Sequence, residues 1–377
     1  MNIAAFSHSY LEPENRKNIL ALTAYASVRV ILPSRGPVLI FRNYEFERSH
    51  FGRKFFMPFR PLYLFNGQYL LWTSTMGLRR FQPDVINVEY NPWSAMFFQV
   101  ILYRALFCRR AKLICTVKKN TYRRYPSWRG WLKKWLSRFS FKRIDHIIAA
   151  SAMAARLYEH KFSVPEHRIT KLHHLGVDTS LFVPKPVRQD EATRPITIGY
   201  CGRFDVDKGI TDLITAVYRV QSRVTRSLVL RLLGDGSLTL ELKQQAANTD
   251  WLEILPPVAN AEVAGFLQDL DIFVLPSRIL EDHQEHDAHA LLEALAVGVP
   301  TIGTRSGIIS EILGDGTGLL VRPKEPDELA AAIEELMNDH RARKMLGMRG
   351  RKKAENEFAL DVIAQQKIKT FQRVLDE

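Results

Sequence analysis

Two cations stand five residues apart in a short loop, and their chemistry suits a diphosphate. The loop reads Gly202-Arg-Phe-Asp-Val-Asp-Lys-Gly209 and directly follows an apolar run, Ile196–Cys201. An arginine can hold phosphate oxygens through two parallel hydrogen bonds, and a lysine can act as a point charge beside a departing phosphate. Arg203 and Lys208 are therefore candidates for binding a diphosphate. The alternative is a solvated loop in which both cations pair with the two aspartates between them.

Two carboxylates, Glu285 and Glu293, follow a second apolar run, Asp271–Leu275. We expect a helix to begin near His289, which places Glu285 on a loop facing a ligand and Glu293 one turn inside the helix. Glu293 could then accept hydrogen bonds from a ribose diol, and the positive end of the helix suits phosphate. The alternative is that Glu293 pairs within the fold and that Glu285 is a solvated acid.

Three histidines in the same segment could be read as a metal site. His283, His286 and His289 stand three residues apart among acidic side chains. Residues at this spacing drift around a helix, and part of the segment is expected to be loop, so the tetrahedral geometry of a zinc site is not implied. We therefore predict no metal site.

Short apolar runs alternate with longer amphipathic segments, which is typical of βαβ units and a parallel sheet. A segment rich in proline and polar residues interrupts the pattern. We expect two Rossmann-like, doubly wound α/β domains, 1–182 and 196–357, joined by a linker at 183–195 and followed by a C-terminal helix at 358–377 that could cross back to the first domain. Ligands of such sheets bind at the carboxyl ends of the strands, where the loops described above lie. The expected strands are Ile3–Phe6, Val28–Leu32, Val85–Val88, Leu113–Val117, His146–Ala150, Ile196–Cys201, Leu228–Leu233, Ile272–Leu275, Thr301–Gly303 and Leu319–Val321.

Positive charge is concentrated in the first half of the chain. The net charge is +13, yet residues 1–180 hold 29 Lys and Arg against 10 Asp and Glu, whereas residues 181–377 hold 24 against 30. Between Tyr90 and Ile144 there are 14 basic residues and no acidic one. This distribution favours an anionic partner in the first domain. Nucleic acid is not predicted, because no DNA- or RNA-binding motif accompanies the charge.

An amphipathic, tryptophan-rich helix is expected at 128–139, within the basic region. A cationic helix of this kind can lie in an anionic membrane interface, so 118–143 is a candidate membrane contact. The alternative is that its aromatic stripe packs on the sheet of the first domain. No stretch reaches the roughly 20 apolar residues of a spanning helix, and neither a signal peptide nor a disulfide framework is apparent. We expect a cytoplasmic protein that could bind the inner face of the cell membrane.

Several segments together resemble the retaining glycosyltransferases of family 4. They are Gly202–Gly209, the Glu285 and Glu293 pair, Leu292–Gly303 and Gly316–Pro323, and the segment 175–184 is similar to the family's entry into its linker. The resemblance covers most of the chain. It implies the GT-B fold, in which two Rossmann-like domains face each other across a cleft.

The resemblance also implies a reaction and roles for residues. A hexose would move from a UDP- or GDP-sugar, without a metal or other cofactor. Arg203 and Lys208 would hold the diphosphate, Glu293 the ribose and Glu285 the donor sugar, with Arg203, Lys208 and Glu285 taking part in catalysis. The other candidates for donor contact are Gly202, Gly234, Ala288, Leu291 and Leu292.

The sequence departs from the family pattern at three places, of which the first is the loop Ser7-His-Ser-Tyr10, where relatives often have Gly-Gly near the donor. Relatives usually follow the first glutamate with small residues such as Gly-Phe-Gly, where this chain has His286-Asp-Ala288. Many also carry a histidine after the strand that is here Leu113–Val117, where this chain has Lys118-Lys-Asn120. Lys118, Asn120 or His8 could replace that histidine on the acceptor side.

The expected function is therefore a glycosyltransferase that acts on a lipid-linked or glycan acceptor in the synthesis of cell-envelope or exported polysaccharide. Two alternatives remain: a relative that binds nucleotide sugars without catalysis, which the last two departures favour, and a nucleotide-sugar 2-epimerase.

Overall fold

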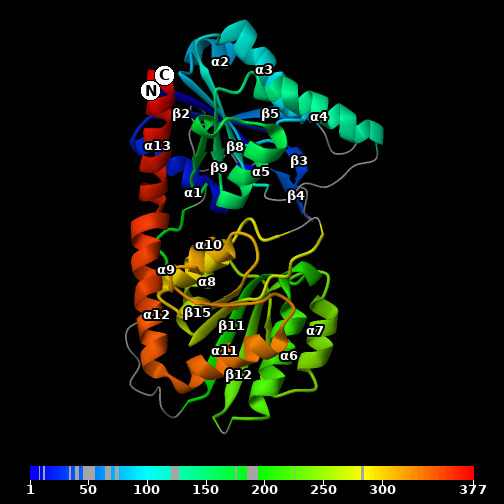
Figure 1. The fold of residues 1–377 in the computed structure, drawn as a ribbon, viewed down its shortest axis with the longest axis vertical. Coiled ribbons are helices and arrows are strands. Elements are labelled where there is room, and N and C mark those ends of the chain that lie inside the picture. The colour runs from blue at the N-terminus through cyan, green and yellow to red at the C-terminus, as the bar shows by residue number, and fades with distance from the viewer. Residues whose placement is uncertain are drawn as a thin grey trace. The chain divides into compact units, whose positions relative to one another are not determined.

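The computed structural model divides into two compact units (Figure 1). Residues 1–175 and 360–377 form the first unit, and residues 176–359 form the second. The described residues are all of 1–377 except 8, 12, 34, 39–41, 46–55, 64–68, 73–75, 120–126, 175, 185–193, 225 and 282–283.

The first unit is built on an eight-stranded sheet with the order β10-β9-β8-β7-β1-β2-β5-β6. The strands run parallel except for β6, which pairs with β5 in the antiparallel direction. A separate antiparallel pair is formed by β3 and β4. The strands are β1 (Asn2–Phe6), β2 (Ser27–Pro33), β3 (Arg35–Val38), β4 (Arg42–Glu45), β5 (Phe56–Tyr63), β6 (Tyr69–Trp72), β7 (Val85–Val88), β8 (Lys112–Val117), β9 (His146–Ala149) and β10 (Ile169–Lys171).

Helices cover both faces of this sheet. Ala4 and Phe6 of β1 share a core with α3, α4 and α5, whereas Ile3 and Ala5 share another with α1 and α13. Successive side chains of a strand point to opposite faces, so a strand buried on both sides must be apolar throughout. The helices are α1 (Pro13–Ala21), α2 (Met76–Phe81), α3 (Ala95–Phe107), α4 (Ser127–Phe141), α5 (Ala152–Phe162) and α13 (Leu360–Asp376), with short 3-10 turns at Ser9–Leu11, Leu22–Ala24 and Glu166–Arg168.

The second unit is a parallel six-stranded sheet with the order β13-β12-β11-β14-β15-β16. Counted within the unit this is 3-2-1-4-5-6, the order of dinucleotide-binding folds. In Figure 1 the sheet lies between helices: α6 packs against α11, and α9 packs against α8 and α12. The strands are β11 (Ile196–Arg203), β12 (Leu228–Asp235), β13 (Leu252–Leu255), β14 (Ile272–Leu275), β15 (Thr301–Thr304) and β16 (Leu319–Val321). The helices are α6 (Ile210–Gln221), α7 (Thr239–Ala246), α8 (Asn260–Gln268), α9 (His289–Val297), α10 (Ile309–Leu313), α11 (Pro326–Asn338) and α12 (His340–Lys353), with a 3-10 turn at Val206–Lys208 and a π-helical turn at Ala354–Phe358.

The segment before β11 belongs to the second unit from Gly176 onward, earlier than the expected linker at 183–195. The Val177 N–H donates to the Phe358 carbonyl at 2.7 Å, and the Arg351 guanidinium donates to the Phe182 carbonyl at 2.6 Å. These bonds tie the segment to the end of the unit. Residues 185–193 of the expected linker lie outside the described residues.

The two doubly wound units confirm the expected fold class. All ten runs predicted as strands are strands, and Val85–Val88, Ile272–Leu275 and Leu319–Val321 have the predicted bounds. The sequence did not predict β3, β4, β5, β6, β10 or β13. Each sheet contains one place where the strand order reverses direction, called the switch point. It lies between β11 and β14 in the second unit and between β1 and β7 in the first. At such a switch point the loops leave the two strands in opposite directions and open a crevice for a ligand.

Candidate active site

Glycines let the loops at the switch point of the second unit approach each other. Gly234 has a φ of +150°, and a Cβ there would lie 1.9 Å from the Gly202 carbonyl oxygen. Gly209, with a φ of +68°, ends the turn after β11, and a Cβ there would lie 2.0 Å from the Pro276 carbonyl oxygen. No other residue could occupy these positions without a shift of the backbone. The turn that carries Lys208 therefore lies against the loop after β14.

Lys208 and Glu285 form a largely buried ion pair between these two loops. The Lys208 Nζ lies 2.7 Å from Glu285 Oε2, and the Ser277 hydroxyl donates to the same oxygen at 2.7 Å. The Glu285 side chain is 2% exposed and that of Lys208 is 12% exposed. The Glu285 carbonyl also accepts the Ile308 N–H at 3.0 Å. The interpretation of Glu285 as a solvated acid is therefore wrong, because the carboxylate is buried and held by two donors.

Arg203 joins this pair through the aspartates of its own loop. Its guanidinium contacts Asp205 and lies 3.6 Å from Asp207 Oδ2, which is 3.9 Å from the Lys208 Nζ. The pairing of both cations with the loop aspartates, expected as an alternative, is thus present. It exists together with the Glu285 contact, so that Arg203, Lys208 and Glu285 form one network. Arg203 is its exposed member, with 42% of its side chain accessible.

Glu293 lies at the same end of the sheet but outside this network of ion pairs. The helix α9 begins at His289 as expected, and Glu293 Oε1 accepts a hydrogen bond from the Asn260 side chain at 2.9 Å. Burial raises the pKa of the Cys201 thiol to about 12, and the charge of Glu293 adds to this effect. Glu293 is therefore close to the end of β11. The pairing of Glu293 within the fold, which was the alternative to a ribose contact, is observed, and the ribose contact stays a prediction.

Three further donor-contact candidates form the start of α9. Ala288 is its N-cap residue and is buried. The side chains of Leu291 and Leu292 belong to the hydrophobic core, and their N–H groups donate to the Ala288 carbonyl at 3.1 and 3.2 Å. The buried positions of the two leucines do not support a contact with the donor sugar nucleotide. That contact stays a prediction.

The two described histidines of this segment, His286 and His289, each contact a different neighbour. His289 Nε2 lies 3.1 Å from Asp287 Oδ1, and the His286 ring is 3.3 Å from the Gln284 carbonyl oxygen. His283 lies outside the described residues. Within the described part of the chain, no group of three His, Cys, Asp or Glu side chains could hold a metal ion.

The switch point of the first unit holds a charged cluster that the sequence did not single out. Glu89 follows β7 directly, and its Oε1 accepts the Tyr10 hydroxyl at 2.6 Å. Burial alone would raise the pKa of Glu89, but the charges of Lys367 and Lys118 and hydrogen bonds from Tyr10 and Ser7 outweigh it and leave the pKa below its usual value. The Nζ of Lys367, a buried residue of α13, donates to the His174 carbonyl at 2.8 Å.

Of the three acceptor-side candidates, Lys118 is thus near enough for its charge to lower the pKa of Glu89, whereas His8 and Asn120 lie outside the described residues. One signal could have found Glu89. It is the first polar residue after the predicted strand Val85–Val88, at the carboxyl end where ligands of parallel sheets bind.

The expected helix at 128–139 is present as α4, and its aromatic stripe is divided: Phe139 packs on Phe98 of α3 with ring centroids 5.6 Å apart, whereas two tryptophans face outward. Trp131 is 67% exposed and Trp135 is 54% exposed, whereas Ser137 and Ser140 are fully buried. The inward packing is therefore wrong for these two tryptophans. Among the helices whose residues are described, none combines the length and apolarity needed to cross a bilayer.

Comparison with known proteins identifies both halves of the chain. Residues 185–353 match the family model of the glycosyl transferases group 1, and residues 22–181 match that of glycosyltransferase family 4. The capsular polysaccharide biosynthesis glycosyltransferase CapM of Staphylococcus aureus is 32% identical over 171 residues, which cover 44% of this chain and 43% of CapM. This chain spans about half the length of the curated relatives it matches.

Solved structures of low identity share the whole fold. A glycosyltransferase from Rickettsia africae matches with a TM-score of 0.76 at 14% identity, covering 100% of this chain and 99% of its own. HepE from Anabaena, solved in complex with UDP and glucose, matches with a TM-score of 0.71 at 17% identity, covering 99% of this chain and 100% of its own. With both halves matched and two Rossmann-like units observed, this chain belongs to the group 1 glycosyltransferases of family 4 and has the GT-B fold.

Proposed function

We propose that this protein is a retaining, metal-independent glycosyltransferase that moves a hexose from a UDP- or GDP-sugar to a lipid-linked or glycan acceptor in the synthesis of cell-envelope or exported polysaccharide. One observation carries the proposal. Lys208 and Glu285 meet at 2.7 Å at the switch point of a sheet whose strand order is that of nucleotide-binding folds. The switch point is where such sheets bind their ligands.

The diphosphate of the donor requires cations, and Arg203 and Lys208 supply them. The network holds these two cations against Asp205, Asp207 and Glu285, so a diphosphate must compete with aspartate for Arg203. The exposed Arg203 can turn from aspartate to phosphate, whereas Lys208 is fixed. The positive end of α9 adds to the attraction of an anion. The UDP bound to HepE supports a uridine diphosphate donor by analogy.

The chemistry assigned to this network is the release of a nucleoside diphosphate from the anomeric carbon. Negative charge grows on the leaving diphosphate as the glycosidic bond breaks, and two fixed cations stabilise it without a metal ion. Glu285 positions Lys208 through its Oε2 atom, and a carboxylate can accept further hydrogen bonds from the hydroxyls of the donor sugar. Glu293 binds the ribose in exchange for its present partner, Asn260.

The acceptor is assigned to the first unit, at the switch point where the charge of Lys118 lowers the pKa of Glu89. The exposed tryptophans of α4 and the basic character of 118–143 favour an anionic membrane surface as the place where a lipid-linked acceptor is met. The role of the relative CapM in capsular polysaccharide biosynthesis supports a polysaccharide product.

A panel of nucleotides tests the donor assignment. We expect UDP or GDP, and one of their hexose conjugates, to raise the melting temperature, because a ligand that binds only the folded state stabilises it. Arg203→Ala should abolish the shift. Arg219→Ala is the matched control, since Arg219 forms an aspartate pair in the same unit, with Asp327 at 2.6 Å. A shift that survives Arg203→Ala would remove the diphosphate assignment.

Turnover of the stabilising donor then separates the three function classes. A transferase releases the nucleoside diphosphate and makes a new glycosidic bond with the anomeric configuration of the donor, in the presence of EDTA. Release of a sugar with inverted configuration at C2 would indicate the epimerase. Binding without any turnover on lipid-linked or glycan acceptors would indicate the non-catalytic relative, and an absolute need for added Mn²⁺ or Mg²⁺ would contradict metal independence.

A further inference from the structure

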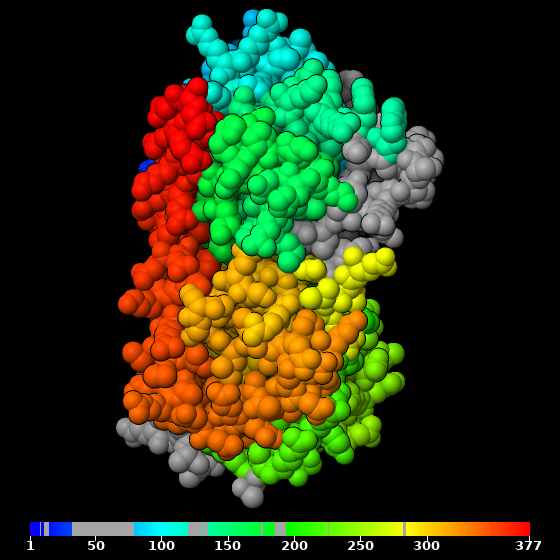
Figure 2. Space-filling model, in the orientation of Figure 1, coloured from blue at the N-terminus to red at the C-terminus, as the bar shows by residue number. Residues whose placement is uncertain are grey.

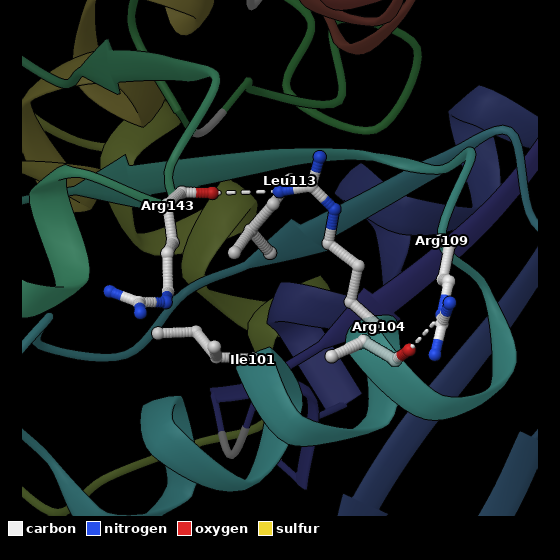
Figure 3. A pocket seen from close by; sticks show the side chains of 6 residues that line it. Ile101, Arg104, Arg109, Leu113 and Arg143 are labelled. Carbon is white, nitrogen blue, oxygen red and sulfur yellow. Dashed lines mark hydrogen bonds between the residues drawn. The ribbon is translucent and has the colours of Figure 1, made fainter.

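A pocket of about 370 Å³ lies in the first unit, at the amino end of β8 and therefore at the opposite end of that strand from Lys118. Figure 3 shows its lining. The guanidinium groups of Arg109 and Arg143 lie at two sides, and that of Arg104 lies between them. The lining residues are Ile101, Arg104, Ala105, Arg109, Leu113 and Arg143, three basic and three apolar.

One of the three arginines is neutralised within the fold. The Arg104 guanidinium lies 2.8 Å from Asp145 Oδ2 and donates to the Arg143 carbonyl at 2.7 Å, and its side chain is 20% exposed. This contact fixes Arg104 as the wall of the pocket. It also leaves the charge of the pocket to Arg109 and Arg143.

The other two guanidinium groups keep donors for a ligand. Arg109 donates through Nε to the Ala105 carbonyl at 2.7 Å, and Arg143 donates through one terminal nitrogen to the Phe139 carbonyl at 3.1 Å. A guanidinium has five N–H donors, so each exceeds what these contacts use. Both residues are exposed. The pocket therefore presents two positive charges to an anion with several acceptor oxygens, such as a phosphate.

Exposed apolar side chains continue from the pocket over α3 and α4. Leu102 and Leu106, which neighbour the lining residues on α3, are each 57% exposed. The Arg143 guanidinium stacks 3.6 Å above the Phe139 ring, which in turn stacks on the exposed Trp135 with centroids 6.2 Å apart. The two helices form part of the surface that Figure 2 shows. The Arg143 guanidinium is thus joined to an exposed tryptophan through the Phe139 ring, and exposed leucines alternate with the lining residues along α3.

We infer that this pocket binds the phosphate of an anionic phospholipid in a bilayer, while Leu102, Leu106, Trp131 and Trp135 enter the interface around it. A soluble phosphate would explain the arginines but not the exposed leucines and tryptophans. An apolar protein partner would leave the two guanidinium charges unmatched. The interface of an anionic bilayer places phosphates beside acyl chains and matches both. The inference rests on the proposed membrane contact and deepens it with a specific headgroup site, formed by Arg143 from that contact and Arg109 from outside it.

Vesicle binding by a charge-matched pair of variants tests the site. The probes are phosphatidylcholine vesicles with and without about one-third phosphatidylglycerol. Each basic residue near an anionic surface strengthens binding about fivefold, so removing two should weaken binding about thirtyfold. We expect this loss for Arg109→Ala with Arg143→Ala on the anionic vesicles. Arg79→Ala with Arg80→Ala removes the same charge from exposed positions of α2 and should change binding less than about threefold. Arg109→Ala alone should weaken it about fivefold.

Three results would overturn the inference. The first is an equal loss of vesicle binding in the two double variants, and the second is equal binding of the unaltered protein to vesicles with and without phosphatidylglycerol. The third is competition by inorganic phosphate at concentrations too low to screen the charge of the bilayer, which would indicate a site for soluble anions. The thermal shift with UDP is measured on every variant. It should be unchanged, so a failure of the headgroup site is distinguishable from a failure of the donor site.

Discussion

Replacement of Lys208 by Met would separate the structural role of the ion pair from its role with the donor. The change removes the Nζ that lies 2.7 Å from Glu285 Oε2 and leaves a carboxylate that is 2% exposed and keeps the Ser277 hydroxyl as a donor. A buried charge without its partner costs about 3 kcal/mol. For a unit of this size, that corresponds to a fall in melting temperature of roughly 10 °C.

Replacement of Glu285 by Gln should reduce the free energy of unfolding much less than Lys208→Met. In Glu285→Gln the Ser277 hydroxyl keeps an acceptor, and Lys208, which is 12% exposed, can reach solvent and Asp207. We expect a loss of about 1 kcal/mol. The double variant buries no charge at this position, so its stability should return to within about 1 kcal/mol of the unaltered protein, which corresponds to a coupling energy of about 3 kcal/mol or more.

Donor turnover should not recover with stability. Loss of a preorganised cation at a leaving group lowers the rate about 10²–10³-fold, and the double variant should be as slow as Lys208→Met. Arg194→Met is the matched control, because Arg194 pairs with the largely buried Asp271 at 2.7 Å at the amino end of the same sheet, and it should reduce stability without changing turnover. Recovery of activity together with stability in the double variant would show that the pair only supports the fold. Unchanged stability of Lys208→Met would show that the pair does not form.

Two further predictions concern the first unit. Burial lowers the pKa of His146 to about 4, and the charge of Arg373 adds to this effect. Between pH 6.5 and 4 the unfolded chain therefore binds a proton that the folded chain excludes, and the free energy of unfolding should fall as the pH decreases through this window. Urea unfolding at several pH values should show a smaller fall for His146→Gln, and an identical fall would refute the assignment. Lys367→Met removes a buried cation beside the partly exposed Glu89 and should destabilise the unit by about 2 kcal/mol. Adding Glu89→Gln should restore most of the loss in the same assay, and a further loss in this double variant would contradict the pairing.

The strands at the centre of both sheets could be predicted because burial on two faces leaves a plain signal. The run Val85–Val88 is buried at every position, as a parallel strand covered by helices must be, and its bounds could be read directly. The strands that were missed lie mainly at the edges, such as β6, β10 and β13. An edge strand has one neighbour and less apolar surface to cover, so its side chains carry a weaker pattern.

The donor network could be predicted in part because its members lie in two loops that follow strands. Arg203 and Lys208 share one loop, and the glycines around them mark a close approach of backbone. The distance between Lys208 and Glu285 could not be predicted, since it depends on β11 lying beside β14. The pairing of Glu89 with Lys367 could not be predicted for a similar reason. Lys367 comes from α13, and although the C-terminal helix was expected to be able to cross back to the first domain, its sequence pattern does not tell which strand end it reaches.

The orientation of α4 shows most clearly where periodicity stops being informative. Helical spacing places the tryptophans on one stripe but does not say which stripe faces the core. The structure buries small polar residues instead: Ser137 is fully buried, and the Ser140 hydroxyl donates to the Pro92 carbonyl at 2.5 Å. Small side chains let the helix lie close to the unit, and a hydroxyl that bonds a backbone carbonyl loses little on burial. Trp131 and Trp135 are left outward, where water gives them no favourable partner. Since exposed apolar patches mark interaction surfaces, the packing of α4 agrees with the membrane contact that we propose for this helix.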